Sequence, residues 1–547
     1  MDKILYSKPI RIGFCIAGML FGILAISSRL LWRDSLESWL ALLVPDKKAI
    51  SLYLMLPTYL GIEMIFISSF ILAYILNRRR LDYVFSKNYY RILLFLCGFF
   101  SLLALLISVN RSFDPDEFEH VHSTWYIVGG YIPYTDFFQN HNPLLWYSLS
   151  PFLLLFGYTV HSVLMLRILM FFLTSAIVYS TYRLSRKING SKEVGLFSGI
   201  LLLSAVMFVG RSIEIRPDVP QVFFGIVSVY ALITYFKVGK LKYIIFSALS
   251  ASLSFIFLQK TVFLLMAYAL IFIYKFLKGK ISFGPMVYFV ICFSLPLSFF
   301  LAYLLLISGS LNNYFITNFT INITHSGNSF SPFAHLKAAI VLNGLFWLLS
   351  LLSLAYTFLS KRMNEEAKTV AFIASVLLAS LFIVKHPYEQ YFMQAIPLLC
   401  VVVGGAFDSL RRRYNANEMQ SLIVILVVIA APLLWLLHLG LHNTNNVQLD
   451  KANYVIQNSE EGDFVYDGSN QFNLYRHDLH YFWCTLGNLS AFNRLTNDKY
   501  GDYDICSLIE SKKPTFISDY GLPMKECGLD NVYAKTRFDG LYVRREK

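Results

Sequence analysis

Residues 92–109, ILLFLCGFFSLLALLISV, form an apolar run without a single charged side chain. A helix of about 20 such residues crosses the hydrocarbon core of a bilayer, and a helix is required because unpaired backbone groups are not tolerated in lipid. The run is apolar on every side, whereas the strands of a membrane barrel alternate, so a barrel is excluded. This stretch therefore predicts a membrane-spanning helix.

Similar runs recur along the whole chain. Of its residues 56% are hydrophobic and only 15% are charged, which is too little charge to cover a soluble protein of this length. We predict about thirteen spans from their length and composition. They are 11–29, 51–76, 92–109, 161–182, 193–210, 219–236, 243–258, 261–277, 283–307, 336–359, 368–384, 390–407 and 419–441.

The net charge of +13 is distributed according to topology. Lysine and arginine gather in alternate short loops, for example at 78–80, 237–242 and 411–413, as is typical of loops on the cytoplasmic side. This pattern predicts a cytoplasmic N-terminus and, with an odd number of spans, an extracytoplasmic C-terminus. The charge therefore indicates orientation, and we expect no nucleic-acid partner.

We expect three regions along the chain. Residues 1–91 hold two N-terminal membrane helices and a basic cytoplasmic loop, 92–441 form the membrane core, and 442–547 form a small external α/β domain. Short strands are predicted at 464–466, 515–517 and 541–543, and helices near 448–457 and 503–511. The tail cysteines, of which one pair could form a disulfide, are Cys484, Cys506 and Cys527.

The external loop 110–160 carries the most informative polar residues, in RSFDPDEFEHVHSTWYIVGGYIPYTDFFQNHNPLLWY at 111–147. Asp114, Pro115 and Glu117 predict a helix start with a capping box. We interpret Asp114 as a cap. For Asp116 and Glu117 we favour function, because acids at the mouth of a membrane bundle are costly unless they are solvated and used.

Two further features of this region have alternative explanations. A divalent metal could bind Asp116, His120 and His122, since imidazole and carboxylate suit several such ions. Histidines near an interface more often only form hydrogen bonds, so we assign no metal ligands and leave the cofactor undetermined. Arg167 lies inside a predicted span, and it either sits near an interface or pairs with an acid in the bundle.

The order of these elements resembles a known family. An acidic pair after a span, then GGYIPYTDFF at 129–138 and HNPLLWY at 141–147, is similar to the first external loop of GT-C glycosyltransferases that use polyprenyl-phosphate sugars. Protein O-mannosyltransferases and lipid A aminoarabinose transferases are the most similar members. The resemblance extends to 215–218, 259–260 and 388–397 and covers about residues 90–441. Family members commonly carry a lysine at the place of His141 and Asn142. This difference bears on the contacts with the donor phosphate and on which sugar is transferred.

This resemblance implies a fold and a reaction. The fold would be an all-α polytopic GT-C bundle with a small external α/β domain. A sugar would pass from a polyprenyl-phosphate donor to a lipid, glycan or protein acceptor by inverting displacement, with Asp116 as base and Glu117 as orienter or reserve base. The implied donor-phosphate ligands are Arg211, Arg216, Lys260 and Lys385. The implied substrate ligands are His120, His141, Asn142, Asp218, Tyr388 and Tyr391.

Other functions are also consistent with a multi-pass membrane protein. A transporter or flippase of lipid-linked sugars would place charges near the bilayer midplane and show repeated halves, whereas here the acids collect in an external loop. A ligase or polymerase of another fold would need charged residues in a later loop, but 308–335 is nearly uncharged. An inactive relative is disfavoured by the intact Asp116 and Glu117. We expect residence in a bacterial inner membrane.

Overall fold

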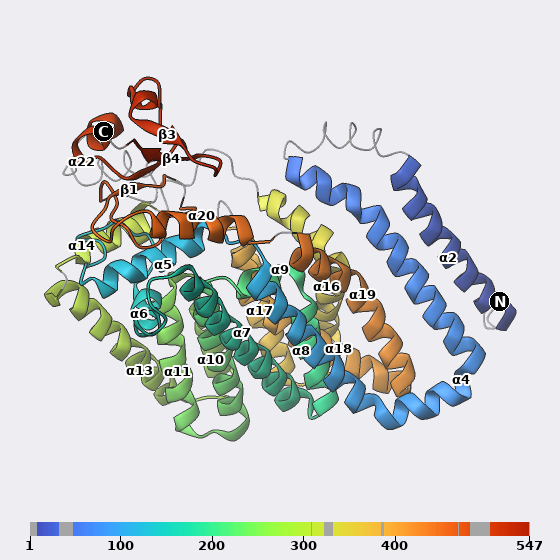
Figure 1. The fold of residues 1–547 in the computed structure, drawn as a ribbon. Coiled ribbons are helices and arrows are strands. Elements are labelled where there is room, and N and C mark those ends of the chain that lie inside the picture. Colours follow the sequence, from blue (N-terminus) through green and yellow to red (C-terminus); the bar gives the residue numbers. More distant parts are fainter. Residues whose placement is uncertain are drawn as a thin grey trace.

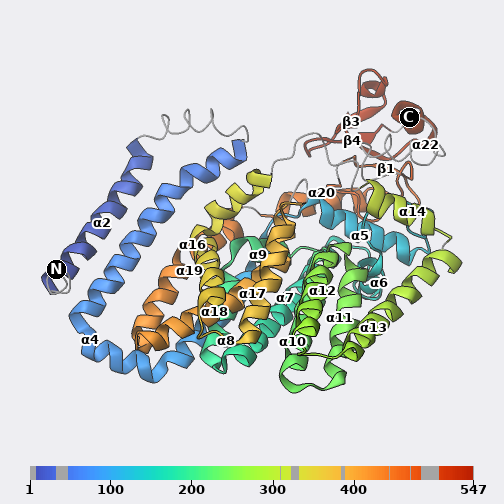
Figure 2. The same ribbon diagram turned by 180° about the vertical axis from the view of Figure 1, so that it is seen from behind.

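The computed structural model describes residues 8–31, 47–307, 309–321, 332–383, 388–442, 444–468, 470–481 and 504–545. Long helices form a bundle, and a small sheet covers one end of it (Figure 1). Seen from behind, the same end carries α5, α6, α20 and the sheet (Figure 2). The loop that the sequence marks as functional and the C-terminal domain therefore lie on the same side of the bundle.

The helices of the first half are α2 (Lys8–Leu31), α4 (Lys47–Asn110), α5 (Pro115–Val128), α6 (Leu144–Phe156), α7 (Val160–Asn189), α8 (Lys192–Ser204), α9 (Val206–Ser212), α10 (Asp218–Val238), α11 (Leu241–Phe257), η1 (Gln259–Thr261), α12 (Val262–Leu277) and α13 (Phe283–Ala302). Those that follow are η2 (Tyr303–Ile307), α14 (Leu311–Phe315), η3 (Ile316–Ile321), α16 (Pro332–Leu359), α17 (Glu365–Ser380), η4 (Glu389–Gln394), α18 (Ile396–Arg413), α19 (Glu418–His442), α20 (Asn446–Gln457), α22 (Ile505–Lys512) and η5 (Leu529–Asn531).

The length and composition of these helices identify a multi-pass integral membrane protein. Seven helices in the described parts of the chain are long and apolar enough to cross a bilayer, and the bent pair α8–α9 would add an eighth. The described residues of the predicted segments lie mostly in helices, but 368–384 runs past the end of α17 at Ser380, and several helices are short: α11 has 17 residues and α17 has 16. The number of about thirteen spans remains a prediction.

The N-terminal helices form a hairpin beside the bundle (Figure 1). α2 packs against α4 where Gly22 meets Gly61, and a Cβ atom on Gly22 would lie 2.5 Å from the carbonyl oxygen of Gly61. This close approach requires glycine at both positions. α4 continues without interruption from Lys47 to Asn110, so one helix crosses the boundary that we expected between residues 91 and 92.

A break between α8 and α9 sets the direction of α9. The two helices meet at an angle of 73° at Ala205, where the helical hydrogen-bond pattern is interrupted. The side chain of Asn343, at a kink in α16, accepts from the Val206 N–H at 2.8 Å and donates to the Ser204 carbonyl at 3.4 Å. Buried backbone groups need such partners. The bend turns α9, which carries Arg211, towards the start of α5.

The C-terminal domain contains a four-stranded sheet of β1 (Val465–Tyr466), β2 (Phe516–Ser518), β3 (Tyr533–Lys535) and β4 (Leu541–Arg544). The strand order is β1-β2-β4-β3, with β1 and β2 parallel and the other pairs antiparallel. Three predicted strands and both predicted helices are confirmed, whereas β3 was not predicted. Its short sequence, Tyr-Ala-Lys, has no clear alternation.

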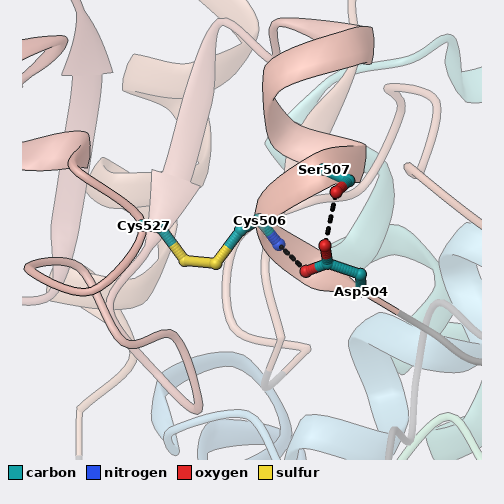
Figure 3. The surroundings of a disulfide bond; sticks show 4 residues. All are labelled: Asp504, Cys506, Ser507 and Cys527. Carbon is teal, nitrogen blue, oxygen red and sulfur yellow. Dashed lines mark hydrogen bonds between the residues drawn. A yellow bond between two sulfur atoms is a disulfide. The ribbon is translucent and has the colours of Figure 1, made fainter.

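A disulfide joins Cys506 in α22 to Cys527 (Figure 3). Asp504 caps the same helix, because its side chain accepts from the Cys506 N–H at 3.0 Å. The bond therefore ties the capped start of α22 to the segment that leads into β3. The third tail cysteine, Cys484, lies outside the described residues.

Candidate active site

The site begins at the first turn of α5. Asp114 caps the helix by accepting from the Asp116 N–H at 3.2 Å, and Glu117 accepts from the Asp114 N–H at 2.9 Å. This is the predicted capping box, with Pro115 at the first helical position. The cap sets the direction of the turn and holds Asp116 beside Arg216, which follows α9.

Glu117 is fully buried and is paired with Arg167 of α7. Arg167 Nε donates to one carboxylate oxygen at 2.7 Å and Nη2 donates to the other at 2.5 Å. The Ile215 N–H also donates to Glu117, at 3.1 Å. Arg167 further donates to the Ser112 carbonyl at 2.9 Å. Arg167 therefore pairs with an acid inside the bundle, as one of our two alternatives predicted. Of the two roles expected for Glu117, the geometry favours the orienter, because both oxygens are occupied.

Asp116 differs from Glu117 in its exposure. Its side chain is 39% exposed, and its Oδ2 lies 2.6 Å from Nη1 of the buried Arg216. No hydrogen bond to its Oδ1 is found among the described residues. One oxygen is thus held in place by an arginine while the other can accept a proton. This arrangement suits a general base.

Arg216 is surrounded by carboxylates. Besides Asp116, it lies 3.6 Å from Asp218, 3.5 Å from Asp114 and 3.8 Å from Glu214. Burial alone would raise the pKa of Asp114, but Arg216 and Arg211 together lower it below the ordinary value. The Arg216 guanidinium therefore lies between several carboxylates, where α5 and α10 begin.

Lys260 and Asp218 form the second half of the site. Lys260 Nζ lies 2.9 Å from Asp218 Oδ1, and it also sits 3.6 Å from the centre of the Tyr391 ring. These three residues come from η1, α10 and η4. The sequence could mark each of them as a candidate, but only the packing of three separate elements brings them together.

The predicted residue Arg211 brings further charged residues into the cluster, and three of these, Arg111, Glu214 and Glu389, were missed by sequence reasoning. Arg211 pairs with Asp114 at 2.8 Å and with Glu214 and Glu389 at 3.0 Å each. Arg111 also pairs with Glu214, at 2.7 Å. Burial raises the pKa of the Glu214 carboxyl, although the neighbouring arginines oppose this. The position of Glu214 between Arg211 and Arg216 in the sequence was the available signal.

The balance of charge in this cluster limits what it can bind. Four cations, each already paired with a carboxylate, face five acids; they are Arg111, Arg211, Arg216 and Lys260 against Asp114, Asp116, Glu214, Asp218 and Glu389. An incoming phosphate must therefore displace a carboxylate from one of the cations. Lys260, with a side chain that is partly exposed, can turn most readily to such a ligand.

Two histidines, His120 and His141, lie close to each other near Asp116. Trp146 Nε1 donates to His120 Nδ1 at 3.1 Å, and the rings of His120 and His141 lie 5.3 Å apart. Burial lowers the pKa of His120 well below its ordinary value and that of His141 to about 4. Both rings are therefore neutral at physiological pH.

The remaining predicted residues lie at varying distances from this cluster. The amide of Asn142 donates to the Phe255 carbonyl at 2.9 Å and accepts from the Tyr314 hydroxyl at 3.0 Å, so it anchors the loop to the bundle. Tyr388 is exposed at the start of η4. Lys385 lies outside the described residues. His122 contacts Asp478 at 2.6 Å, and no group of three metal-ligating side chains occurs in the described part of the chain.

Glu119 is a buried acid that the sequence did not single out for a role. Asn470 of the C-terminal domain donates to it at 3.3 Å. Burial, helped by the charge of Asp116, raises the pKa of Glu119 to about 8. The carboxyl is therefore mostly protonated at neutral pH. The spacing of three residues from Asp116 was the available signal, since it places both acids on one helix face.

The shifted pKa of Glu119 predicts a pH-dependent stability. The folded protein keeps a proton that the unfolded chain releases above its ordinary pKa of 4.5, so stability falls as pH rises from there through about 8. We expect Glu119→Gln to raise the midpoint of thermal unfolding in detergent by about 2–4 °C near pH 8.5 and to leave it unchanged near pH 5. Glu526→Gln, at an exposed carboxylate, is the control. Identical pH profiles for wild type and Glu119→Gln would contradict the assignment.

Comparisons with known proteins agree with this architecture. Residues 140–300 match the family described as dolichyl-phosphate-mannose-protein mannosyltransferase, a range that includes His141, Arg216, Asp218 and Lys260. A search of curated proteins gave no sequence match.

Solved structures extend the similarity over most of the chain. ArnT from Cupriavidus metallidurans, bound to undecaprenyl phosphate, has a TM-score of 0.60 and 13% identity, covering 82% of this chain and 97% of that one. The oligosaccharyltransferase AglB from Archaeoglobus fulgidus, in complex with an inhibitory peptide and a dolichol-phosphate, has a TM-score of 0.50 and 10% identity, covering 83% and 74%. At these identities the likeness establishes the fold. The chain therefore has the fold of these two proteins, and residues 140–300 match the mannosyltransferase family model.

Proposed function

We propose that this protein transfers a sugar from a polyprenyl-phosphate donor to an acceptor on the extracytoplasmic side of the membrane. The observation that carries the proposal is Asp116, a half-exposed carboxylate held by Arg216 beside the Asp218–Lys260 pair. The ligands of the structural relatives, undecaprenyl phosphate in ArnT and a dolichol-phosphate in AglB, support a lipid phosphate as donor group.

The reaction is a direct displacement. A hydroxyl or amine of the acceptor attacks the anomeric carbon while Asp116 accepts its proton. The bond between that carbon and the phosphate oxygen breaks, and the polyprenyl phosphate leaves with the electron pair. Lys260 stabilises the charge that develops on the leaving oxygen, and Arg211 and Arg216 add to the local positive potential. Inversion at the anomeric carbon follows from the single displacement.

The division of labour among the acids follows from their contacts. Glu117 supports the start of α5 through Arg167 and so fixes the direction of Asp116. Asp218 holds Lys260 and Arg216 in the resting site, and it turns to the sugar when the phosphate takes over Lys260. Tyr391 packs on Lys260 and limits its movement.

The placement in the cell is part of the same proposal. The N-terminus lies in the cytoplasm, and loop 110–160 and the C-terminal domain lie outside, in the periplasm of a bacterium. The acceptor is a lipid, a glycan or a protein on that side. The regions 1–91, 92–441 and 442–547 serve as N-terminal hairpin, catalytic core and external domain.

The experiment that tests the function is a transfer assay with the purified full-length protein in detergent. Undecaprenyl-phosphate donors that carry radiolabelled sugars are incubated with a total membrane extract, and incorporation of label is measured. We expect label in the acceptor fraction from at least one donor. Flux of intact donor across proteoliposome membranes with no transfer would instead support a flippase of lipid-linked sugars.

Replacement of Lys260 tests the phosphate contact. We expect Lys260→Gln to weaken binding of undecaprenyl phosphate by about 10- to 100-fold, because a hydrogen bond to a charged group is lost. Binding is measured by the change in intrinsic fluorescence on titration in detergent. Lys278→Gln, at an exposed lysine just after α12, is the control. Equal affinities for Lys260→Gln and wild type would remove Lys260 from the donor site.

A further inference from the structure

The hydrogen bond between Trp146 and His120 determines which nitrogen of His120 carries the proton. An indole N–H can only donate, so His120 Nδ1, which lies 3.1 Å from it, is the acceptor. His120 is neutral, since burial, His141 and Arg216 all lower its pKa. The proton of a neutral ring must then reside on Nε2. His120 therefore presents an N–H donor on the side away from Trp146.

This donor has no partner within the part of the chain that the structure describes. His120 Nε2 is buried without a hydrogen bond, and so is Nδ1 of His141, whose ring lies 5.3 Å away. A buried polar group without a partner costs about 1–3 kcal/mol. Two such atoms on adjacent rings are costly in a packed loop unless a ligand group satisfies both of them.

The position of the pair connects it to the site. His120 lies one helical turn after Asp116, and His141 is within electrostatic range of Asp116, Arg216, Lys260 and Asp218. His120 itself is fully buried, whereas His141 is partly exposed. A group that reaches His120 must therefore enter beside the charged cluster, where the sugar of a lipid-linked donor would lie.

The N–H donor of His120 restricts which chemical group can bind there. It must offer a lone pair, which excludes an ammonium, since an ammonium has only hydrogens to donate. A hydroxyl accepts from His120 through one lone pair. It can also donate to His141 if Nδ1 is unprotonated, or accept from it through its second lone pair if Nδ1 carries the proton. A hydroxyl thus satisfies both histidines in either tautomer of His141.

We propose that His120 and His141 form a binding seat for one hydroxyl of the transferred sugar, which makes the protein selective for a neutral sugar over an amino sugar. This inference rests on the proposed glycosyl transfer and adds the class of sugar to it. His120 is a residue that determines sugar specificity. The displacement is performed by the charged cluster around Arg216.

The test compares matched donors in a binding assay that needs no acceptor. Undecaprenyl phosphate alone, undecaprenyl-phosphate glucose and its counterparts with an amino group in place of one hydroxyl are each titrated against the full-length wild-type protein in detergent. We expect replacement of one particular hydroxyl to weaken binding about tenfold or more, because the His120 N–H loses its acceptor. A second neutral series with mannose covers the other common orientation of the 2-hydroxyl.

Two variants separate the donor from the bulk of the ring. His120→Gln can keep an N–H near the position of Nε2 and should retain the preference for hydroxyl, whereas His120→Leu should bind the hydroxyl and amino donors with equal affinity. Binding of undecaprenyl phosphate alone reports on the fold and on the phosphate site in each variant, and it should stay unchanged.

The outcomes distinguish the inference from the function on which it rests. If wild type binds undecaprenyl phosphate but shows no preference in any hydroxyl–amine pair, the seat holds water only and the inference is overturned. An unchanged preference in His120→Leu would overturn it as well. If wild type binds neither the lipid phosphate nor any donor, the proposed function itself fails.

Discussion

We expect Asp116→Asn to lower the rate of sugar transfer strongly while the protein remains folded and still binds undecaprenyl phosphate. The substitution keeps the size of the side chain and its contact with Arg216, but an amide cannot accept the proton of the acceptor. Loss of a positioned general base typically lowers the rate by about 10²- to 10⁴-fold. The measurement is the initial rate of label transfer from the active undecaprenyl-phosphate donor.

A matched control for this variant lies in the same external segment. Asp136 is an exposed acid that accepts from the Ile132 N–H at 2.6 Å, away from the charged cluster. Asp136→Asn keeps an acceptor for that N–H and should transfer sugar at the wild-type rate. Full activity of Asp116→Asn would exclude Asp116 as the base and leave another carboxylate of the cluster, such as Asp218, as the candidate.

Arg167→Met should destabilise the protein severely. The side chain is fully buried, and its loss leaves the Glu117 carboxylate without a countercharge and removes a donor from three backbone carbonyls, those of Ser108, Arg111 and Ser112. Removal of one partner from a buried ion pair costs about 3–5 kcal/mol. We expect a large fall in the yield of monodisperse protein and in the temperature at which it aggregates.

The double variant Arg167→Met with Glu117→Gln distinguishes ion pairing from packing. It removes both charges and keeps an amide oxygen as acceptor for one of the two N–H groups, of Asp114 and Ile215, that donate to Glu117. It should therefore recover part of the lost stability. Arg183→Met, at an exposed arginine of the same helix, serves as the control. Size-exclusion chromatography after heating measures all four proteins. A wild-type profile for Arg167→Met would show that the pair is dispensable.

The start of α5 shows how much local sequence can predict. Asp114, Pro115 and Glu117 specify a capping box through contacts within four residues, and the structure confirms it. The sequence left two alternatives open for Arg167, a position near an interface or an ion pair in the bundle, because its partner Glu117 is 50 residues away. Glu117 was likewise assigned two roles, and only its burial against α7 favours orientation over proton transfer.

The charged cluster shows where prediction from sequence ends. Arg211, Arg216, Asp218 and Lys260 could be named from the family resemblance and from their place on the predicted external side. Their grouping depends on the 73° bend at Ala205, and no residue before it marks this bend. Asn343, which completes the hydrogen bonds at the break, lies more than 130 residues further along the chain. Glu214 and Glu389 were missed because an acid at a helix end is usually only solvated.

Two kinds of information thus specify this protein. Membrane insertion, the N-cap of α5 and the elements of the C-terminal domain other than β3 depend on hydrophobic length and short-range hydrogen bonds, so the sequence alone determined them. The pairing of charges, the neutral state of His120 and the protonation of Glu119 depend on burial and on partners from distant segments, so only the tertiary structure decided them. The physical reason is that the energy of a charge or proton is set by its surroundings, and packing creates these.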